Sequence, residues 1–280
     1  MPLAHLGPEL EVEYDLEGRG DPVTLVCGLG VQRGVWQEVV DELGGSFQLL
    51  TYDLRGYRGS SPPDPFTIAD LAGDLVRLLD RLGTGPVHLV GHSQGGFIAL
   101  EATLARPDLV RSLVLAGSAS YTDEYGRHVL QSWRDTLLHQ GQKAFYENIF
   151  LWHYSPDYFN DRTQELKMMK KWLSRSSFPV DTYLAHNRAC ESHETRDRLR
   201  ALDLPTLLLG GAEDRVMGLR HNRLLHELIT GSRVVTLDRL GHDLFVESPY
   251  RTLPHIADFL AAQGRRKAVR AAAGGGESTL

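Results

Sequence analysis

Three residues in this chain have the types and the order needed for nucleophilic catalysis: a serine, an aspartate and a histidine. The stretch GHSQGG at 91–96 follows the apolar, β-branched run 87–90 and precedes the apolar run 97–104. This pattern predicts a strand, a sharp turn and a helix. Glycines two positions either side of Ser93 permit a strained backbone there, which exposes the hydroxyl at the helix N-terminus. Ser93 is therefore a candidate nucleophile. The alternative is a glycine-rich turn in a structural βα unit, which would have the same sequence pattern.

A serine hydroxyl is a poor nucleophile at neutral pH, so it needs a base, and the base needs a carboxylate to fix its tautomer. His242 follows a glycine just after the apolar run 233–237, and Asp214 comes soon after the run 205–209. The carboxyl ends of parallel strands meet at one edge of a sheet, where ligands bind. We therefore predict His242 as the base and Asp214 as the acid. Three other carboxylates remain alternatives for the acid: Glu213, Asp238 and Asp243.

The negatively charged oxygen that forms on attack needs N–H donors already in place. The backbone N–H of Gln94, at the start of the helix predicted to follow Ser93, is one predicted donor. The other is the N–H of Leu29, in the glycine-flanked turn 28–30. A tight strand-to-helix turn is the alternative interpretation of these glycines.

These groups need elements that position them, and the chain from residue 23 alternates strand and helix. The predicted strands are 23–27, 47–52, 87–90 and 113–116, and a helix at 67–82 is capped by Thr67 and ended by Gly83. The rhythm resumes with strands 205–209 and 233–237 and helices 219–229 and 251–262. It predicts an α/β fold with a mostly parallel sheet and helices on both faces. Residues 9–16 are predicted to form an edge strand that enters a hairpin through the turn 18–22.

Between about 118 and 200 the rhythm breaks and only helical segments are predicted, with turns at 141, 155–156 and 176–179. This span holds 13 of the chain's 23 aromatic residues. We predict an inserted helical cap, or lid, at 118–200, between core segments 1–117 and 201–263. Its aromatic residues either form the cap's own core or face a ligand. The predicted substrate-binding residues are Phe150, Trp152, Tyr154 and, in the core, Gly28. Residues 264–280 are predicted to be a disordered tail, with a partial helix extension as the alternative.

Composition narrows the possible partners. The net charge of −6 gives no indication of a nucleic-acid surface. Cys27 and Cys190 do not have the C-x-x-C spacing of a metal site. We predict that both are buried thiols in a reducing compartment. No signal peptide or run of about 18 apolar residues is present, so we expect a cytoplasmic protein without a membrane span.

Five stretches together resemble the α/β-hydrolase fold family: CGLG at 27–30 with Trp36, DLRGY at 53–57, GHSQGG at 91–96, GAEDR at 211–215 and GHDLFVESP at 241–249. The resemblance spans residues 8 to 263 and is strongest to the small capped members: enol-lactonases, carbon–carbon bond hydrolases and cofactor-free perhydrolases. Two positions depart from the family pattern. Cys27 stands where a histidine is common, and Arg58 stands where a glycine is expected. Arg58 is a candidate contact for a carboxylate substrate or a solvated side chain. Ser93, in place of an aspartate, argues against epoxide hydrolases and dehalogenases.

The resemblance implies a serine hydrolase that cleaves a carboxylic ester or lactone through Ser93, His242 and Asp214, with an acyl-enzyme intermediate and no metal or cofactor. The same groups would serve carbon–carbon bond hydrolysis or perhydrolysis. A scaffold that binds a small ligand without turnover is a further alternative. The aromatic cap indicates a sizeable apolar or polyketide-like small molecule as the substrate, and we expect neither nucleic acid nor membrane as a partner. The oligomeric state is left open.

Overall fold

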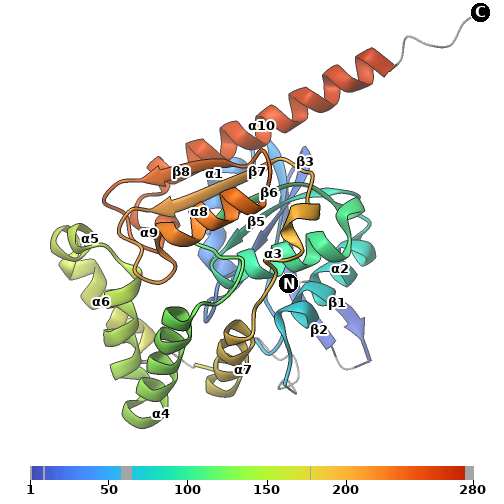
Figure 1. Cartoon of the computed structure of the whole chain (residues 1–280). Coiled ribbons are helices and arrows are strands. Elements are labelled where there is room, and N and C mark those ends of the chain that lie inside the picture. The colour runs from blue at the N-terminus through green and yellow to red at the C-terminus, as the bar shows by residue number, and fades with distance from the viewer. Residues whose placement is uncertain (1, 9, 58–64, 177, 275–280) are drawn as a thin grey trace, which may run out of the picture.

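Apolar strands alternate with helices to build an eight-stranded sheet in the order β1-β2-β4-β3-β5-β6-β7-β8 (Figure 1). The computed structural model describes residues 2–8, 10–57, 65–176 and 178–274, with side chains up to residue 264. Strands from β4 to β8 in this order run parallel, whereas β1 and β2 run antiparallel to their neighbours. The strands are β1 (Leu3–Gly7), β2 (Leu10–Gly18), β3 (Asp21–Val26), β4 (Phe47–Tyr52), β5 (Val87–His92), β6 (Val110–Ala116), β7 (Thr206–Gly211) and β8 (Arg233–Leu237). The predicted mostly parallel α/β sheet is confirmed.

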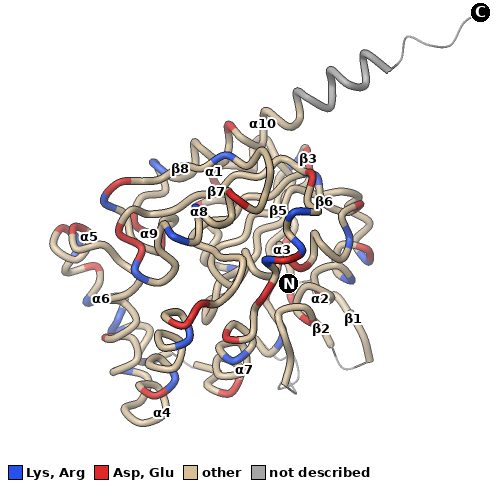
Figure 2. The backbone as a smooth tube through the Cα atoms, in the orientation of Figure 1, with Lys and Arg blue, Asp and Glu red and all other residues tan. Residues whose placement is uncertain are grey.

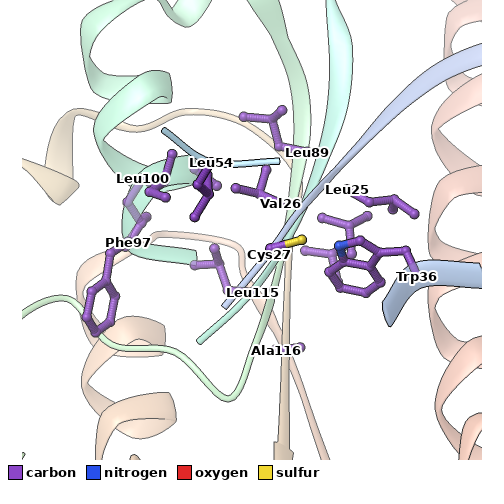
Figure 3. Close-up of a cluster of buried hydrophobic side chains, with 14 of the residues drawn as sticks. Leu25, Val26, Cys27, Trp36, Leu54, Leu89, Phe97, Leu100, Leu115 and Ala116 are labelled. Atoms are coloured by element: carbon purple, nitrogen blue, oxygen red, sulfur yellow. The ribbon is translucent and has the colours of Figure 1, made fainter. Parts of the chain in front are cut away.

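Helices cover both faces of this sheet. The α-helices of the core are α1 (Gln37–Leu43), α2 (Ile68–Leu82), α3 (Gln94–Ala105), α8 (Gly218–Leu228), α9 (Leu244–Glu247) and α10 (Pro249–Gly274), with short 3-10 turns at Arg33–Trp36, Pro107–Leu109 and Leu199–Ala201. Helix α2 packs on α3, and α1 packs on α10. Figure 3 shows Phe97 and Leu100 on one side of the central strands and Trp36 on the other. Burial of apolar side chains on both faces is what holds a parallel sheet between its helices.

Helix α2 begins and ends where its sequence predicts. The Asp70 N–H donates to Thr67 Oγ1 at 3.2 Å, and the Asp70 carboxylate accepts the Thr67 N–H at 2.8 Å. Gly83 closes the helix with φ 61°, a left-handed conformation that glycine adopts without strain. Both predicted caps are confirmed.

The predicted edge strand and hairpin are wrong. Strand β2 pairs with β1 on one side and with β4 on the other, so β1 forms the edge and β2 does not pair with β3. The turn after β2 crosses the start of β4 instead. A Cβ atom at Gly18 or Gly20 would collide with the carbonyl oxygens of Phe47 and Ser46. The glycines therefore allow this crossing and not a hairpin.

Four helices lie between β6 and β7, over the span that was predicted to be an inserted cap. They are α4 (Glu124–His153), α5 (Pro156–Asp161), α6 (Thr163–Leu173) and α7 (Val180–Glu191). Gly141 interrupts α4 with φ 83°, and Ser155 caps α5 through a hydrogen bond from the Tyr158 N–H. Figure 1 shows these four helices gathered at one end of the molecule, beside the sheet.

The last helix is longer than predicted. Helix α10 runs from Pro249 to Gly274 and takes in most of the segment predicted as a disordered tail. The sequence RRKAVRAAA at 265–273 is rich in alanine and arginine, which favour helix. Residues 275–280 lie outside the described part of the chain.

Charged residues of both signs are interspersed along the chain (Figure 2). Within the described ranges, no helix combines the length and apolarity that a bilayer crossing requires.

A buried arginine anchors the loop that follows β3. Arg33 is only 6% exposed; its backbone N–H donates to Asp53 Oδ1 at 2.8 Å and its guanidinium pairs with the Asp53 carboxylate. The same guanidinium contacts Asp15 at 2.7 Å and Glu13 at 3.2 Å. Arg33 therefore ties the loop between β3 and α1 to the strands beside it.

Replacing Arg33 by methionine would remove the guanidinium that pairs with the buried Asp53 carboxylate. We expect Arg33→Met to lower the free energy of unfolding by about 3 kcal/mol, measured by urea denaturation. The control is Arg19→Met at an exposed position, expected to change stability by less than about 0.5 kcal/mol. Equal effects of the two substitutions would contradict the anchoring role of Arg33.

Candidate active site

Ser93 lies at a strained turn between β5 and α3. Its φ of 54° and ψ of −120° are rare for a residue with a side chain, and its N–H donates to the Ala116 carbonyl at 2.9 Å. A Cβ atom at Gly91 would collide with the Gly95 carbonyl oxygen, and one at Gly95 with the Val26 carbonyl oxygen. The strain predicted at the serine is present, and the two glycines are what permit it.

His242 and Asp214 lie close together on the loops that follow β8 and β7. His242 Nδ1 donates to Asp214 Oδ2 at 2.9 Å, and both side chains are buried. Asp214 Oδ1 accepts the backbone N–H groups of Val216 and Met217 at 2.8 and 2.9 Å. With Nδ1 carrying the proton, Nε2 of a neutral His242 is free to accept one.

Electrostatics stabilise this pair in its charged form. Burial raises the pKa of Asp214, but the His242 charge and the hydrogen bonds to the carboxylate outweigh it and lower the pKa to about 2. Burial also lowers the pKa of His242, but the Asp214 carboxylate outweighs it, and the net pKa is raised above 6.5. The pair is therefore suited to hold a proton on His242 transiently.

The other carboxylates considered for this position lie elsewhere. Asp238 is exposed and Glu213 is half-buried, and in the described part of the chain neither side chain bonds to His242. Asp243 Oδ2 accepts a hydrogen bond from His153 Nδ1 at 3.1 Å. Asp214 is the carboxylate that holds the His242 Nδ1 proton.

The backbone around His242 is fixed by the segment that joins α4 to α5. The His153 carbonyl accepts the N–H of His242 at 2.7 Å and that of Asp243 at 3.2 Å. Glu247 Oε1 accepts the Gly241 N–H at 2.8 Å, and Glu247 Oε2 accepts the Ser155 hydroxyl at 2.6 Å. Burial raises the pKa of Glu247 to about 7. These bonds tie residues 153–155 to the loop that carries His242.

Sequence reasoning missed three of the residues that hold the His242 loop. His92 Nε2 donates to the His242 carbonyl at 3.0 Å, and burial lowers the pKa of His92 to about 4, so its ring is neutral at pH 7. Glu247 lies in the GHDLFVESP stretch and His92 lies in GHSQGG, so both belong to motifs that the sequence analysis had already identified. His153 had no signal in the sequence.

The two residues predicted to supply N–H donors, Leu29 and Gln94, line the same cavity as Ser93. Gln94 begins α3, where backbone N–H groups point out of the helix end. The turn with Leu29 passes close by, because a Cβ atom at Gly28 would lie 3.3 Å from the Ser93 Cβ. A negatively charged oxygen formed beside Ser93 could accept hydrogen bonds from the N–H groups of both residues.

Ser93 and His242 open into a cavity of about 700 Å³ lined mainly by apolar side chains, both aromatic and aliphatic. No hydrogen bond joins Ser93 Oγ to the His242 ring among the described residues, as is common in enzymes without substrate. Core and inserted helices both contribute to the walls, among them Trp36, Phe97, Phe245, Trp133, Phe145, Tyr146, Phe150 and Tyr183.

Three of the four predicted substrate-binding residues line this cavity. They are Gly28, Phe150 and Tyr154. Trp152 does not: its Nε1 donates to Asn148 Oδ1 at 3.2 Å, and its ring packs near Tyr125. Positions four apart share a helix face whereas positions two apart do not, so Phe150 and Trp152 point to different sides of α4. Arg58 lies outside the described residues, and no cluster of three metal-binding side chains occurs within them.

Comparisons with known proteins agree with the α/β fold described above. Residues 21–249 match the family described as the alpha/beta hydrolase fold. A protein of Azorhizobium caulinodans named "Putative carbamate hydrolase RutD" is 29% identical over 251 residues, which cover 89% of this chain and 94% of that protein. A thermophilic esterase from Thermogutta terrifontis is 25% identical with a TM-score of 0.80, covering 90% of this chain and 94% of the esterase. The enol-lactonase from Burkholderia xenovorans LB400 is similar in fold, at 23% identity and a TM-score of 0.84, covering 93% of this chain and 100% of the lactonase.

The raised pKa of His242 can be measured directly. We expect the imidazole of His242 to titrate with a midpoint above 6.5 when followed by NMR of the folded protein. In Asp214→Asn the negative charge is gone and burial remains, so the midpoint should fall below the wild-type value. A midpoint that is the same in both proteins would show that Asp214 does not set the charge of His242.

Proposed function

Because this chain belongs to the alpha/beta hydrolase fold family, we propose that it cleaves a carboxylic ester or lactone with Ser93 as its nucleophile. One observation carries the proposal. Ser93 is strained at the start of α3 and shares a cavity with His242, whose Nδ1 is held by Asp214 at 2.9 Å. A serine, a base and a carboxylate in this relation are the parts of an acyl-transfer site.

In the proposed mechanism, the Ser93 hydroxyl attacks the carbonyl carbon while His242 Nε2 takes its proton. Asp214 keeps the Nδ1 proton in place and stabilises the resulting imidazolium. The N–H groups of Leu29 and Gln94 bind the negatively charged oxygen. His242 returns the proton to the leaving oxygen, and an acyl-enzyme remains on Ser93. Water, deprotonated by His242, then releases the acid and restores Ser93.

The substrate we propose is a small apolar or polyketide-like ester or lactone that fills the cavity beneath the inserted helices. A volume of about 700 Å³ suits a drug-sized molecule. Aromatic side chains on α4 and α7 would contact its apolar part, so residues 118–200 would act as the cap of the site. The proposed substrate contacts include three of the predicted substrate-binding residues: Phe150, Tyr154 and Gly28.

Carbamate cleavage is the second candidate. It rests on the name of the relative that is 29% identical over 89% of this chain. A carbamate has a carbonyl that the same serine can attack, so the roles of Ser93, His242 and Asp214 would not change. The nature of the leaving group is what separates the two candidates.

A fluorophosphonate probe tests for an activated nucleophile. We expect one adduct at pH 7, located on Ser93 by mass spectrometry and absent in Ser93→Ala. His242→Ala should slow labelling by about 100-fold or more, since the base no longer takes the serine proton. An adduct at another residue, or labelling that His242→Ala leaves unchanged, would refute the proposed nucleophile.

A panel of an apolar ester, a lactone, a carbamate and a diketone tests the reaction type. We expect the ester or lactone to give the highest kcat/KM, with Ser93→Ala at least about 1,000-fold less active. A higher kcat/KM for the carbamate would support the second candidate. The diketone serves as the comparison for carbon–carbon cleavage, and preference for it would reject both.

A further inference from the structure

Two neighbouring aromatic rings in the cavity wall each contain a buried polar atom without a partner. Among the described residues, neither Trp133 Nε1 nor His153 Nε2 makes a hydrogen bond, and both residues line the cavity that contains Ser93. The two rings meet edge to face with their centres 5.5 Å apart. Trp133 is 97% buried, being only 3% exposed. A buried polar atom without a hydrogen bond costs about 1–3 kcal/mol, so two such atoms on neighbouring rings of one cavity indicate a place for a polar ligand group.

The two atoms have opposite hydrogen-bond character. Indole Nε1–H only donates. His153 Nδ1 lies 3.1 Å from Asp243 Oδ2, a carboxylate that accepts, so Nδ1 carries the ring proton. When the ring is neutral, its Nε2 is then an acceptor. A donor and an acceptor on adjacent rings match a hydroxyl group, which accepts one hydrogen bond and donates another.

One of the two rings, that of His153, lies beside the group that would protonate the leaving oxygen. The ring centre of His153 is 5.1 Å from that of His242. His242 returns its proton to the leaving atom in the proposed mechanism, so the part of the substrate next to that atom lies near His153. A hydroxyl one or two carbons beyond the leaving oxygen is then placed to meet both rings.

We propose that Trp133 Nε1 and His153 Nε2 form a subsite for a hydroxyl group on the alcohol side of the substrate. This inference rests on the proposed function and narrows its substrate class to esters or lactones whose alcohol part carries a second hydroxyl. Asp243 acts as a positioning residue, because it fixes which nitrogen of His153 accepts. Apolar cavity walls hold the acyl side.

A pair of esters with the same acyl group tests the subsite. The esters are 2-hydroxyethyl butanoate and propyl butanoate, which have nearly the same size and differ in the hydroxyl. We measure kcat/KM for both and express the result as a preference ratio. The wild-type protein should prefer the hydroxyethyl ester by about tenfold or more, because the propyl ester leaves the two buried atoms unpaired. Trp133→Phe and His153→Leu should each reduce this preference to less than about threefold.

Two control substitutions lie on the same helix, α4. Trp152→Phe removes an indole N–H that donates to Asn148 away from the cavity, and His128→Leu removes an exposed imidazole. Both should keep the wild-type preference. Trp133→Phe retains an aromatic ring and leaves the backbone bonds of His153 to the His242 loop in place. A loss of preference in this variant is therefore not explained by a displaced loop.

The outcomes separate this inference from the proposed function. A wild-type protein that hydrolyses both esters equally well would overturn the subsite and leave the proposed function standing. Unchanged preference in Trp133→Phe and His153→Leu would also overturn it, even if both variants lost overall activity. Hydrolysis of neither ester by the wild-type protein, with no labelling of Ser93, would overturn the proposed function and the subsite with it.

Discussion

The site depends on one close backbone contact, that between the first turn of α3 and the end of β3. Gly95 lies against the Val26 carbonyl with no space for a Cβ atom, and Gly91 likewise has no space for one against the Gly95 carbonyl. This contact holds Ser93 at its strained positive φ of 54°. It also brings the turn with Gly28 and the N-terminus of α3 close to the serine. One packing constraint therefore positions the serine and the two segments that carry the proposed N–H donors.

Glycines at the ends of β6 and β7 open the space for the histidine and aspartate. Gly117 has φ 52°, and a Cβ there would lie 3.1 Å from His242 Nδ1 and 3.4 Å from Asp214 Oδ2. Gly211, at the end of β7, has the carbonyl oxygens of Leu240 and Gly241 directly against it. A larger residue at either strand end would push His242 away from the sheet edge. The His242–Asp214 pair thus rests directly on the backbone of the sheet, which holds it in one place.

The inserted helices also help to position His242. Its backbone N–H bonds to the carbonyl of His153, and Glu247 joins Gly241 to Ser155. Because the same residue, His153, also contributes a side chain to the cavity, movement of α4 relative to the sheet would change both the His242 loop and the cavity wall. In the proposed mechanism, substrate contacts and proton transfer would both depend on this short segment.

The parts of this structure that follow from local pattern could be predicted from the sequence, and the parts that depend on distant packing could not. Strand-to-helix turns and the α2 caps depend on residues a few positions apart, so their glycines and Thr67 indicated them. The predicted hairpin was wrong because β4, whose residues lie some thirty positions further on, inserts between β2 and β3. The aromatic composition of residues 118–200 indicated the inserted helices. Which aromatic residues face the cavity depends on the helical periodicity of α4, which turns Phe150 toward it and Trp152 away. His153 meets Asp243 across 90 residues, and a contact at that separation is specified by the packed fold and by no motif.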